Sequence, residues 1–369
     1  MRNASKHGIY VRCDENALVE NCYIHDNGKA GELGGGIAIH NTYKSTFRNL
    51  FIYNNYNAGL YHNVSNYENL LENIISMHNG IDGGGGSGFD LLDSYRCRFS
   101  NLYAIENYAK GITVDGAPTL SECVFENIIL YANGQGGDST IGQGAKIAGD
   151  KLTINNLIAK DNLGQGLELI DVTNSTITNV VSEGNEYGIM FNKECRFITL
   201  INLVLRENKE AGFNLFGARD ITVINIQAIN NGQAASPTYP YGIRLDGSTA
   251  TRADDTTAYA ENIIIIGGKA TDTQTTKTQT YGVYFDTHVR YCKLAYLDLR
   301  GNATAAGKFT GTAVSDNEIN NILGYVTKNS GVVTLTGDGS TTEFVAKVEH
   351  GLVLSLIHIS EPTRPLYIS

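Results

Sequence analysis

The sequence lacks a basic excess, a long apolar run and a helical hydrophobic stripe. Lys and Arg number 28 against 38 Asp and Glu, a net charge of −10. This balance argues against a nucleic acid partner, because phosphates require a basic surface. It also disfavours polyanionic glycans unless calcium or a local basic patch intervenes. No stretch is long and apolar enough to span a membrane, and no window repeats apolar residues at helical or heptad spacing.

Proline is scarce, and cysteine and histidine show no metal-binding spacing. Five prolines stand beside 41 glycines, as expected of an architecture with many tight corners. The six cysteines form no metal motif, and His25, His40, His62 and His78 share no phase of any repeat. These observations disfavour a zinc site, and we expect no bound metal.

What the sequence has in abundance is asparagine at a fixed spacing. Pairs six positions apart recur at Asn21/Asn27, Asn49/Asn55, Asn73/Asn79, Asn101/Asn107, Asn127/Asn133, Asn156/Asn162, Asn179/Asn185, Asn202/Asn208 and Asn225/Asn231. A glycine followed by apolar–any–apolar comes at a variable distance after each pair, and such glycines run from Gly8 to Gly311. Successive glycines are at their closest 22 to 24 residues apart, and a fixed period in that range is typical of a solenoid.

The local pattern indicates strands. After each glycine the first residue is apolar except at Thr312, the third is apolar except at His62, and the second varies freely. Such a period of two predicts a strand with one buried face. The segments between paired asparagines are rich in Ile, Leu, Val and Tyr, which favours strands again. Asparagine tolerates the left-handed backbone of a sharp corner, and its amide can bond the same amide one turn on, forming a ladder.

This repeat resembles the right-handed parallel β-helix of the pectate-lyase-like superfamily, over roughly residues 1–324. The resemblance implies an all-β fold, a single-stranded right-handed parallel β-helix of about twelve turns, followed by the start of a small β-domain. Residues 325–353 resemble small β-domains that follow β-helices in phage and archaeal-virus structural proteins, with an ordinary domain-joining hairpin as the alternative. Residues 354–369 resemble a translated sequencing adapter, and we expect a truncated N-terminus because the first turn begins at once.

Insertions in a solenoid indicate its working face. The long connections between an asparagine pair and the next glycine fall at 28–35, 80–87, 134–143, 232–241 and near 269–281. Because all occupy the same corner, we expect a wall of loops beside the glycine-anchored strands. A separate insertion at 247–257 decorates the far end of its turn. Loops on a rigid scaffold often carry binding, and tolerated drift at an exposed corner is the alternative.

Beside that wall, the free position after four successive glycines carries a polar or charged residue. These residues are Asp90, Thr113, Lys146 and Glu168, and Asp115 follows Thr113 on the same strand. Two carboxylates can serve glycoside hydrolysis, whereas elimination or epimerisation of a uronate needs a cation and a base. We therefore predict Asp90, Asp115, Lys146 and Glu168 as catalytic candidates, with Asp90 or Asp115 as the base. The alternative is an ordinary surface ion pair between Lys146 and Glu168.

A family comparison bears on Asp90. Gly88-Phe89-Asp90, followed one turn later by residues 109–115, resembles the stretch of mannuronan C5-epimerases that carries their catalytic Tyr-Gly-Phe-Asp-Pro-His. The resemblance implies a role for Asp90. Ser87 stands at the family's tyrosine position and Leu92 at its histidine position, so the resemblance does not extend to epimerase activity of that type.

Further candidates concern substrate, calcium and thiols. Tyr23, Phe51 and Tyr103 each follow the first asparagine of a pair by two residues and could stack on sugar faces, with surface filling as the alternative; Arg244 completes the predicted substrate-binding set. Residues 85–90 match half of a calcium-binding glycine nonapeptide, which works in tandem, so a flexible loop is the alternative and no cofactor is expected. The equivalent positions of Cys97 and Cys123 indicate stacked thiols, or else a disulfide.

The predicted function is carbohydrate interaction in an extracellular or virion setting, such as a phage tail spike or fibre that binds a polysaccharide or surface glycan. Superfamily resemblance carries most of this prediction. A binding spike would be expected to form a homotrimer, with no nucleic acid partner and no membrane span. The alternatives are a polysaccharide lyase, hydrolase or epimerase, and a structural spacer rod.

Overall fold

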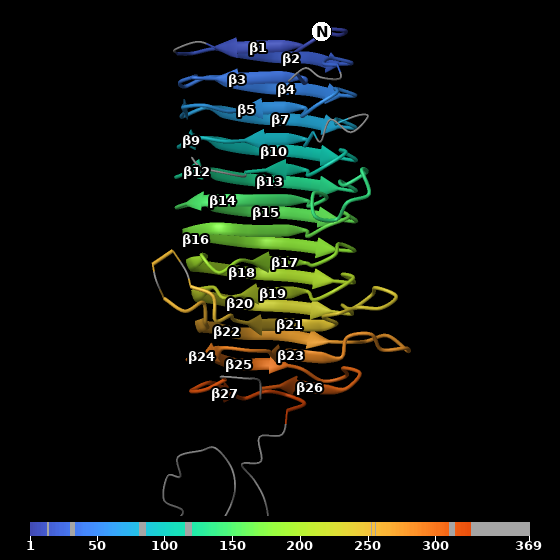
Figure 1. The fold of residues 1–369 in the computed structure, drawn as a ribbon, viewed down its shortest axis with the longest axis vertical. Helices are drawn as coiled ribbons and strands as arrows, with labels where there is room; N and C mark the ends of the chain where they lie inside the picture. Colours follow the sequence, from blue (N-terminus) through green and yellow to red (C-terminus); the bar gives the residue numbers. More distant parts are fainter. Residues whose placement is uncertain are drawn as a thin grey trace, which may run out of the picture. The chain divides into compact units, whose positions relative to one another are not determined.

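The computed structural model describes residues 1–12, 15–29, 34–80, 86–114, 120–251, 253–254, 256–309 and 314–325. Residues 1–325 form one compact unit, a parallel β-solenoid of about eleven turns (Figure 1). Its 27 strands join in one continuous sheet that winds along the coil, and the described ranges contain no helix. Across those ranges, therefore, nothing helical is long and apolar enough to cross a membrane. The all-β prediction is confirmed.

One series of strands follows the anchor glycines, and we call it the Gly-anchored sheet. Each member pairs in parallel with the next. Its members are β1 (Ile9–Arg12), β3 (Ile37–His40), β5 (Leu60–His62), β8 (Phe89–Leu91), β11 (Ile112–Thr113), β14 (Ala145–Asp150), the start of β16 (Leu167–Glu183), β17 (Ile189–Phe191), β19 (Phe213–Phe216), β21 (Tyr241–Asp246), β23 (Tyr281–Phe285) and β26 (Ala305–Lys308).

A second series contains the first asparagine of each pair, and we call its members the Asn-bearing strands. They are β2 (Leu18–His25), β4 (Thr46–Tyr53), β7 (Leu70–Met77), β10 (Arg98–Ile105), β13 (Val124–Tyr131), β15 (Thr153–Lys160), the rest of β16, β18 (Arg196–Arg206), β20 (Arg219–Ile229), β22 (Ala260–Thr271), β25 (Lys293–Asp298) and β27 (Glu318–Asn320). Four short strands lie between the series: β6 (Asn66–Tyr67), β9 (Ser94–Tyr95), β12 (Leu120–Ser121) and β24 (Val289–Arg290).

The anchor glycines are explained by close approach between turns. From Gly36 to Gly282, a Cβ atom at each anchor would meet the carbonyl oxygen of the next anchor residue and the side-chain amide of an Asn or Gln. The register opposite Gly282 places Ala306 in the last described turn, and the predicted anchor Gly311 lies outside the described residues. Ala306 fits the same rule, because β26 pairs with β23 and with no later described strand of this sheet.

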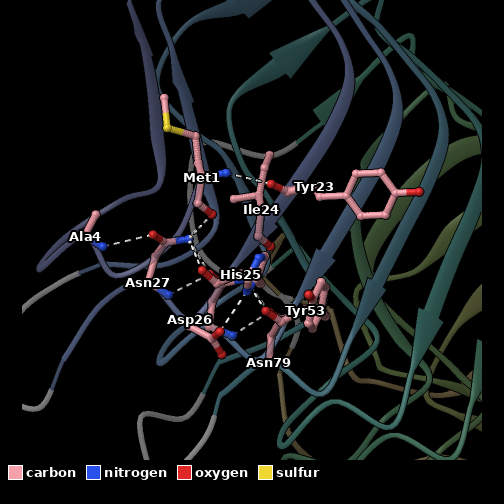
Figure 2. A network of polar contacts seen from close by, with 10 residues as sticks. Met1, Ala4, Tyr23, Ile24, His25, Asp26, Asn27, Tyr53 and Asn79 are labelled. Carbon is pink, nitrogen blue, oxygen red and sulfur yellow. Dashed lines mark hydrogen bonds and ion pairs between the residues drawn. The ribbon is translucent and has the colours of Figure 1, made fainter.

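The two asparagines of each pair have different roles. The first adopts a left-handed backbone, with φ between 53° and 59° from Asn49 to Asn225, as predicted for a sharp corner. The second is buried, and its Nδ2 donates to the Oδ1 of its equivalent one turn further on, for example from Asn107 to Asn133 at 2.9 Å. Figure 2 shows the start of this buried ladder, where Asn27 also accepts a bond from Ala4 N.

The buried ladder extends beyond the nine pairs. Gln279 takes the place of asparagine after Asn231, accepting its Nδ2 at 3.1 Å and donating to Asn302 at 2.8 Å. The outer ladder runs in the opposite sense, since Asn101 Nδ2 donates back to Asn73 Oδ1 at 2.9 Å. The predicted amide ladder is therefore present twice, once buried and once at the surface.

His62, the exception to the apolar pattern, is a buried neutral histidine. Asn69 Nδ2 lies 3.1 Å from its Nε2, so Nε2 accepts and the proton resides on Nδ1, which donates to Ser94 Oγ at 2.8 Å. Burial is the largest cause that lowers its pKa from 6.5 to about 3. The ring thus serves as a core side chain and not as a ligand.

This histidine predicts an acid-dependent loss of stability. Between pH 6.5 and about 3 the unfolded chain takes up a proton at His62 that the folded chain does not, so stability falls as pH falls, by up to about 4 kcal/mol. We expect His62→Gln, which can still accept and donate, to flatten the pH dependence of the urea midpoint over this window. His78→Gln, on a side chain that is 44% exposed, is the control; equal slopes in the two variants would contradict the prediction.

Five cysteines lie in the described ranges, and all are free thiols. Cys97 and Cys123 are buried on adjacent turns, as expected for stacked thiols. Each thiol donates to the carbonyl oxygen two residues before it, Cys97 Sγ to Tyr95 O and Cys123 Sγ to Ser121 O, so the two cysteines are equivalent on neighbouring turns. The structure therefore favours the thiol interpretation over the disulfide.

The longer described loops, including those after β13, β20 and β22, project from one side of the coil (Figure 1). The insertion at 247–257 lies on the other side. Lys193 Nζ donates to Thr251 O at 2.7 Å, Ala253 N donates to the Glu194 carboxylate, and Arg219 pairs with Asp254. The insertion is thus held against earlier turns. Residues 30–33, 81–85 and 326–369 lie outside the described ranges, as do the predicted C-terminal domain and adapter-like tail.

Candidate functional site on the Gly-anchored sheet

The predicted catalytic residues lie in one outward column of the Gly-anchored sheet. Asp90 is in register with Thr113, Thr113 with Lys146, and Lys146 with Glu168, on four consecutive turns. Their neighbours along each strand, such as Phe89, Ile112 and Ala145, are fully buried in the core. Alternation along the strand therefore presents these side chains on the outer face of the sheet. Asp115 lies outside the described residues, so its place in this group stays a prediction.

The residues directly before the anchor glycines form a second column, which lies beside the column of Asp90, Thr113, Lys146 and Glu168. It brings Ser87, Lys110, Gln143 and Gln165 onto the same four turns. Gln143 Nε2 donates to Glu168 Oε2 at 3.0 Å, and Ser87 Oγ lies 3.1 Å from Thr113 Oγ1. The two columns thus form one polar surface in which amides and hydroxyls position the charged groups.

Tyr61 is a member of this surface that the sequence analysis missed. It is in register with Asp90 on the preceding turn, and Ala58 N lies 3.4 Å from its hydroxyl oxygen. Burial raises the pKa of Tyr61, and the charge of Asp90 raises it further, so the phenol stays protonated at neutral pH. A tyrosine is therefore in register with Asp90, although Ser87 replaces the tyrosine of the epimerase pattern.

The local charge differs from that of the whole chain. Lys110 and Lys146 lie on adjacent turns of this face, and both are half-buried. Asp90 and Glu168 lie on the turns before and after them. The middle of the face therefore has two cations between two carboxylates, on a chain whose net charge is −10.

Arg244 lies further along the same outward column, after Met190 and Asn214. It is 7% exposed and bonded to Asp246 and Asp286, and its role in substrate binding stays a prediction. The sequence analysis did not identify its partners. Asp246 lies two residues further along the same strand, and Asp286 lies on the next turn.

The aromatic candidates lie elsewhere. Tyr23, Phe51 and Tyr103 belong to the Asn-bearing strands and share a column with Ile75, so the structure does not bring them together with Asp90 or Lys146. Tyr23 is 69% exposed, and its ring points away from the amide network (Figure 2). A hollow of about 570 Å³ beside them is lined by Asn21, Tyr23, Asn49, Phe51, Asn73 and Ile75. Isoleucine within the column favours an apolar strip over a purely aromatic platform.

No resident metal is indicated by the side chains that the structure describes, since they contain no group of three or more His, Cys, Asp or Glu placed to hold an ion. Part of the half-matched calcium motif, including Gly85, falls outside those residues. The calcium hypothesis therefore stays untested.

Comparison with known proteins supports the fold. Residues 1–127 match the family model described as right handed beta helix region. The A-module of mannuronan C-5 epimerase AlgE4 from Azotobacter vinelandii superposes with a TM-score of 0.54 at 15% identity, covering 82% of this chain and 91% of that one. The A-module of AlgE6 from the same organism gives 0.49 at 13% identity, covering 84% and 75%.

The enzymatically active domain of tailspike protein 2 from bacteriophage CBA120 gives a TM-score of 0.48 at 11% identity, covering 90% of this chain and 49% of that one. A sequence comparison with curated proteins gives no match. At these identities a shared fold says nothing about a shared reaction. The family match covers the first 127 residues, and the parallel coil continues through the later described turns, so the fold is a right-handed parallel β-helix.

Proposed function

We propose that the outer face of the Gly-anchored sheet binds a polysaccharide that runs along the coil. The observation that carries this proposal is the outward column Asp90, Thr113, Lys146 and Glu168, one polar side chain per turn. Adjacent strands lie about 4.8 Å apart, close to the advance per sugar unit of an extended glycan. Successive sugars can therefore meet successive side chains.

The charges in the middle of this face favour an acidic sugar there. Lys110 and Lys146 can bond a uronate carboxylate, which offsets the repulsion expected from a chain of charge −10. Asp90 and Glu168 can accept hydroxyl protons from neighbouring sugars. The epimerase module that shares the fold acts, by its name, on a mannuronan, a polymer with carboxylate groups.

Catalysis is a second candidate because Tyr61 lies beside Asp90. Removal of the proton next to a uronate carboxylate needs a base, a group that returns or accepts a proton, and a cation on the carboxylate. Asp90, Tyr61 and Lys146 are residues of these three kinds on neighbouring turns. Unsaturated products would establish a lyase, new reducing ends without unsaturation a hydrolase, and inversion at C5 without chain cleavage an epimerase; loss of the product in Asp90→Asn would place the activity here.

The binding proposal predicts a selective effect of charge removal. With the full chain and hexagalacturonate or hexamannuronate as probes, we expect Lys146→Ala to weaken binding by about tenfold, equivalent to about 1.4 kcal/mol, in titration calorimetry. Lys160→Ala is the matched control, since Lys160 lies on β15 and pairs with Glu183 at 3.0 Å. Equal losses in the two variants would contradict a site on the Gly-anchored face and would leave only a general charge effect.

The setting we propose is extracellular or virion-associated, where surface glycans are met. A homotrimer stays a prediction for such a binding rod. If neither binding nor product release is detected with any acidic or neutral glycan, the structural spacer becomes the better interpretation.

A further inference from the structure

A second, chemically different cavity lies further along the Gly-anchored sheet. It measures about 300 Å³ and is bounded by residues from β17, β19 and β21 and by the loop before β21. Its apolar lining consists of Tyr187, Met190, Phe216 and Tyr239. The column positions between Lys146 and Arg244 are Glu168, Met190 and Asn214, so the residues that line the cavity lie two to four turns beyond Lys146, with Arg244 on the fourth.

Arg244 is the centre of its polar side. Its Nη2 donates to Asp246 Oδ2 at 2.7 Å and to Asp286 Oδ2 at 2.8 Å, and its Nη1 lies 3.3 Å from Asn214 Oδ1. Asp246 is fixed from its other oxygen as well, since Thr287 Oγ1 donates to Oδ1 at 2.8 Å. These bonds position the polar groups before any ligand arrives, which reduces the ordering cost of binding.

Aromatic rings lie next to Arg244 on its own turn and on the following one. The Arg244 guanidinium lies over the Tyr239 ring at 3.8 Å, and Tyr241 stacks on Tyr284 with centroids 4.3 Å apart. Burial raises the pKa of Tyr187, with the charges of Glu210 and Glu186 adding to the effect. Its phenol therefore remains a neutral O–H donor at the cavity wall.

The charges here disfavour an acidic ligand. Arg244 is the cation at the cavity, and the two carboxylates bonded to it already exceed its charge. The charges of Glu210 and Glu186 reach Tyr187, and Glu210 accepts a hydrogen bond from the backbone N of Tyr239. A uronate carboxylate would meet net negative charge, whereas sugar hydroxyls can donate to carboxylate oxygens while the apolar face of the ring lies on tyrosine.

We infer that this cavity binds a neutral sugar residue. The inference rests on the proposed function and deepens it: a polymer that reaches both places would carry an acidic unit at Lys110 and Lys146 and a neutral unit two to four turns away. Its ligand would then be a heteropolysaccharide with both kinds of sugar and not a polyuronate alone. Tyr239, which lines the cavity, would set the preference for the neutral unit, and Asp286, which lies one turn beyond Arg244, would hold Arg244 in position through Oδ2.

The test measures neutral and acidic probes separately on the full chain. The neutral probes are cellohexaose, maltohexaose and mannohexaose, the acidic probe is hexagalacturonate, and binding is followed by titration calorimetry. We expect at least one neutral probe to bind, and Tyr239→Ala to weaken it at least tenfold while leaving hexagalacturonate within about twofold. Asp286→Asn should weaken the same neutral probe. Tyr131→Ala, at an exposed tyrosine on the Asn-bearing strand β13, is the matched control and should change neither.

Three results would overturn the inference. One is neutral binding that Tyr239→Ala and Asp286→Asn leave unchanged while both variants keep the parent unfolding midpoint. Another is a loss of hexagalacturonate binding in Tyr239→Ala, which would place an acidic sugar in this cavity. The third is the absence of binding by every neutral probe. In that last case, hexagalacturonate binding that is lost in Lys146→Ala would still support the proposed function. If hexagalacturonate does not bind either, both the proposed function and this inference are wrong.

Discussion

Asn107→Ala is expected to destabilise the protein by about 3–5 kcal/mol, one of the two largest effects of any single substitution considered. Asn107 Oδ1 accepts both the backbone N and the Nδ2 of Asn79, each at 3.1 Å. Its Nδ2 donates to Asn133 Oδ1 at 2.9 Å and to Ser76 O at 3.0 Å. Alanine would leave two buried donors of Asn79 without this acceptor, and water cannot replace it in a packed core. Urea unfolding of the full chain measures the loss.

The same turn supplies the control. Asn101 belongs to the surface ladder, and its φ of 53° suits glycine, so Asn101→Gly keeps the corner while removing the amide. We expect a loss of at most about 1 kcal/mol, because water can bond the groups left behind. If the two variants lose equal stability, the buried ladder does not hold the turns together in the way described.

Gly111→Ala should cost about 3 kcal/mol or more, for a reason that involves no hydrogen bond. A Cβ atom there would lie 2.5 Å from Gly144 O and 2.9 Å from Asn133 Nδ2, inside contact distance for both. Neither atom can move freely, since one is backbone and the other is part of the buried ladder. The adjacent turns would therefore have to separate. Thermal and urea midpoints of the purified variant report the cost.

Gly137 separates this contact from ordinary glycine effects. An added Cβ at Gly137 would meet nothing within 4 Å, but its φ is +81°, so alanine there suffers backbone strain alone. We expect Gly137→Ala to lose about 1 kcal/mol. A Gly111→Ala variant no less stable than Gly137→Ala would show that the close approach between turns tolerates a methyl group.

Much of the coil was predictable because identical turns repeat identical constraints. Left-handed corners select Asn101 and its equivalents, buried amides select Asn107 and its equivalents, and close turn contacts select glycine. The asparagine pattern missed the later turns, where a different residue type takes the position of asparagine. Gln279 reaches the same partners as asparagine, and Gly267 and Tyr296 take the left-handed backbone further along. The insertion at 247–257 also lengthens one turn, so the period is lost there.

The candidate site was predictable only in so far as it follows from the alternation of inward and outward side chains along each strand. Alternation along strands correctly placed Asp90, Lys146 and Glu168 on one outward column. It could not show which side chains touch across turns, such as Arg244 and Asp286, because that depends on side-chain conformation. Nor could it show that Tyr239, from a connecting loop, covers Arg244. Loop geometry follows local turn chemistry, which the repeat does not encode.

The regular register between turns has a consequence for any long ligand. Two groups in the same column can be separated only by whole numbers of turns, in steps of about 4.8 Å. The coil therefore fixes the spacing between side chains of one column. Lys146 and Arg244 are four turns apart, and Glu168, Met190 and Asn214 occupy the three turns between them. A polymer whose own repeat length equals a whole number of turns can contact both Lys146 and Arg244 without bending. One whose repeat does not match loses alignment with every further unit.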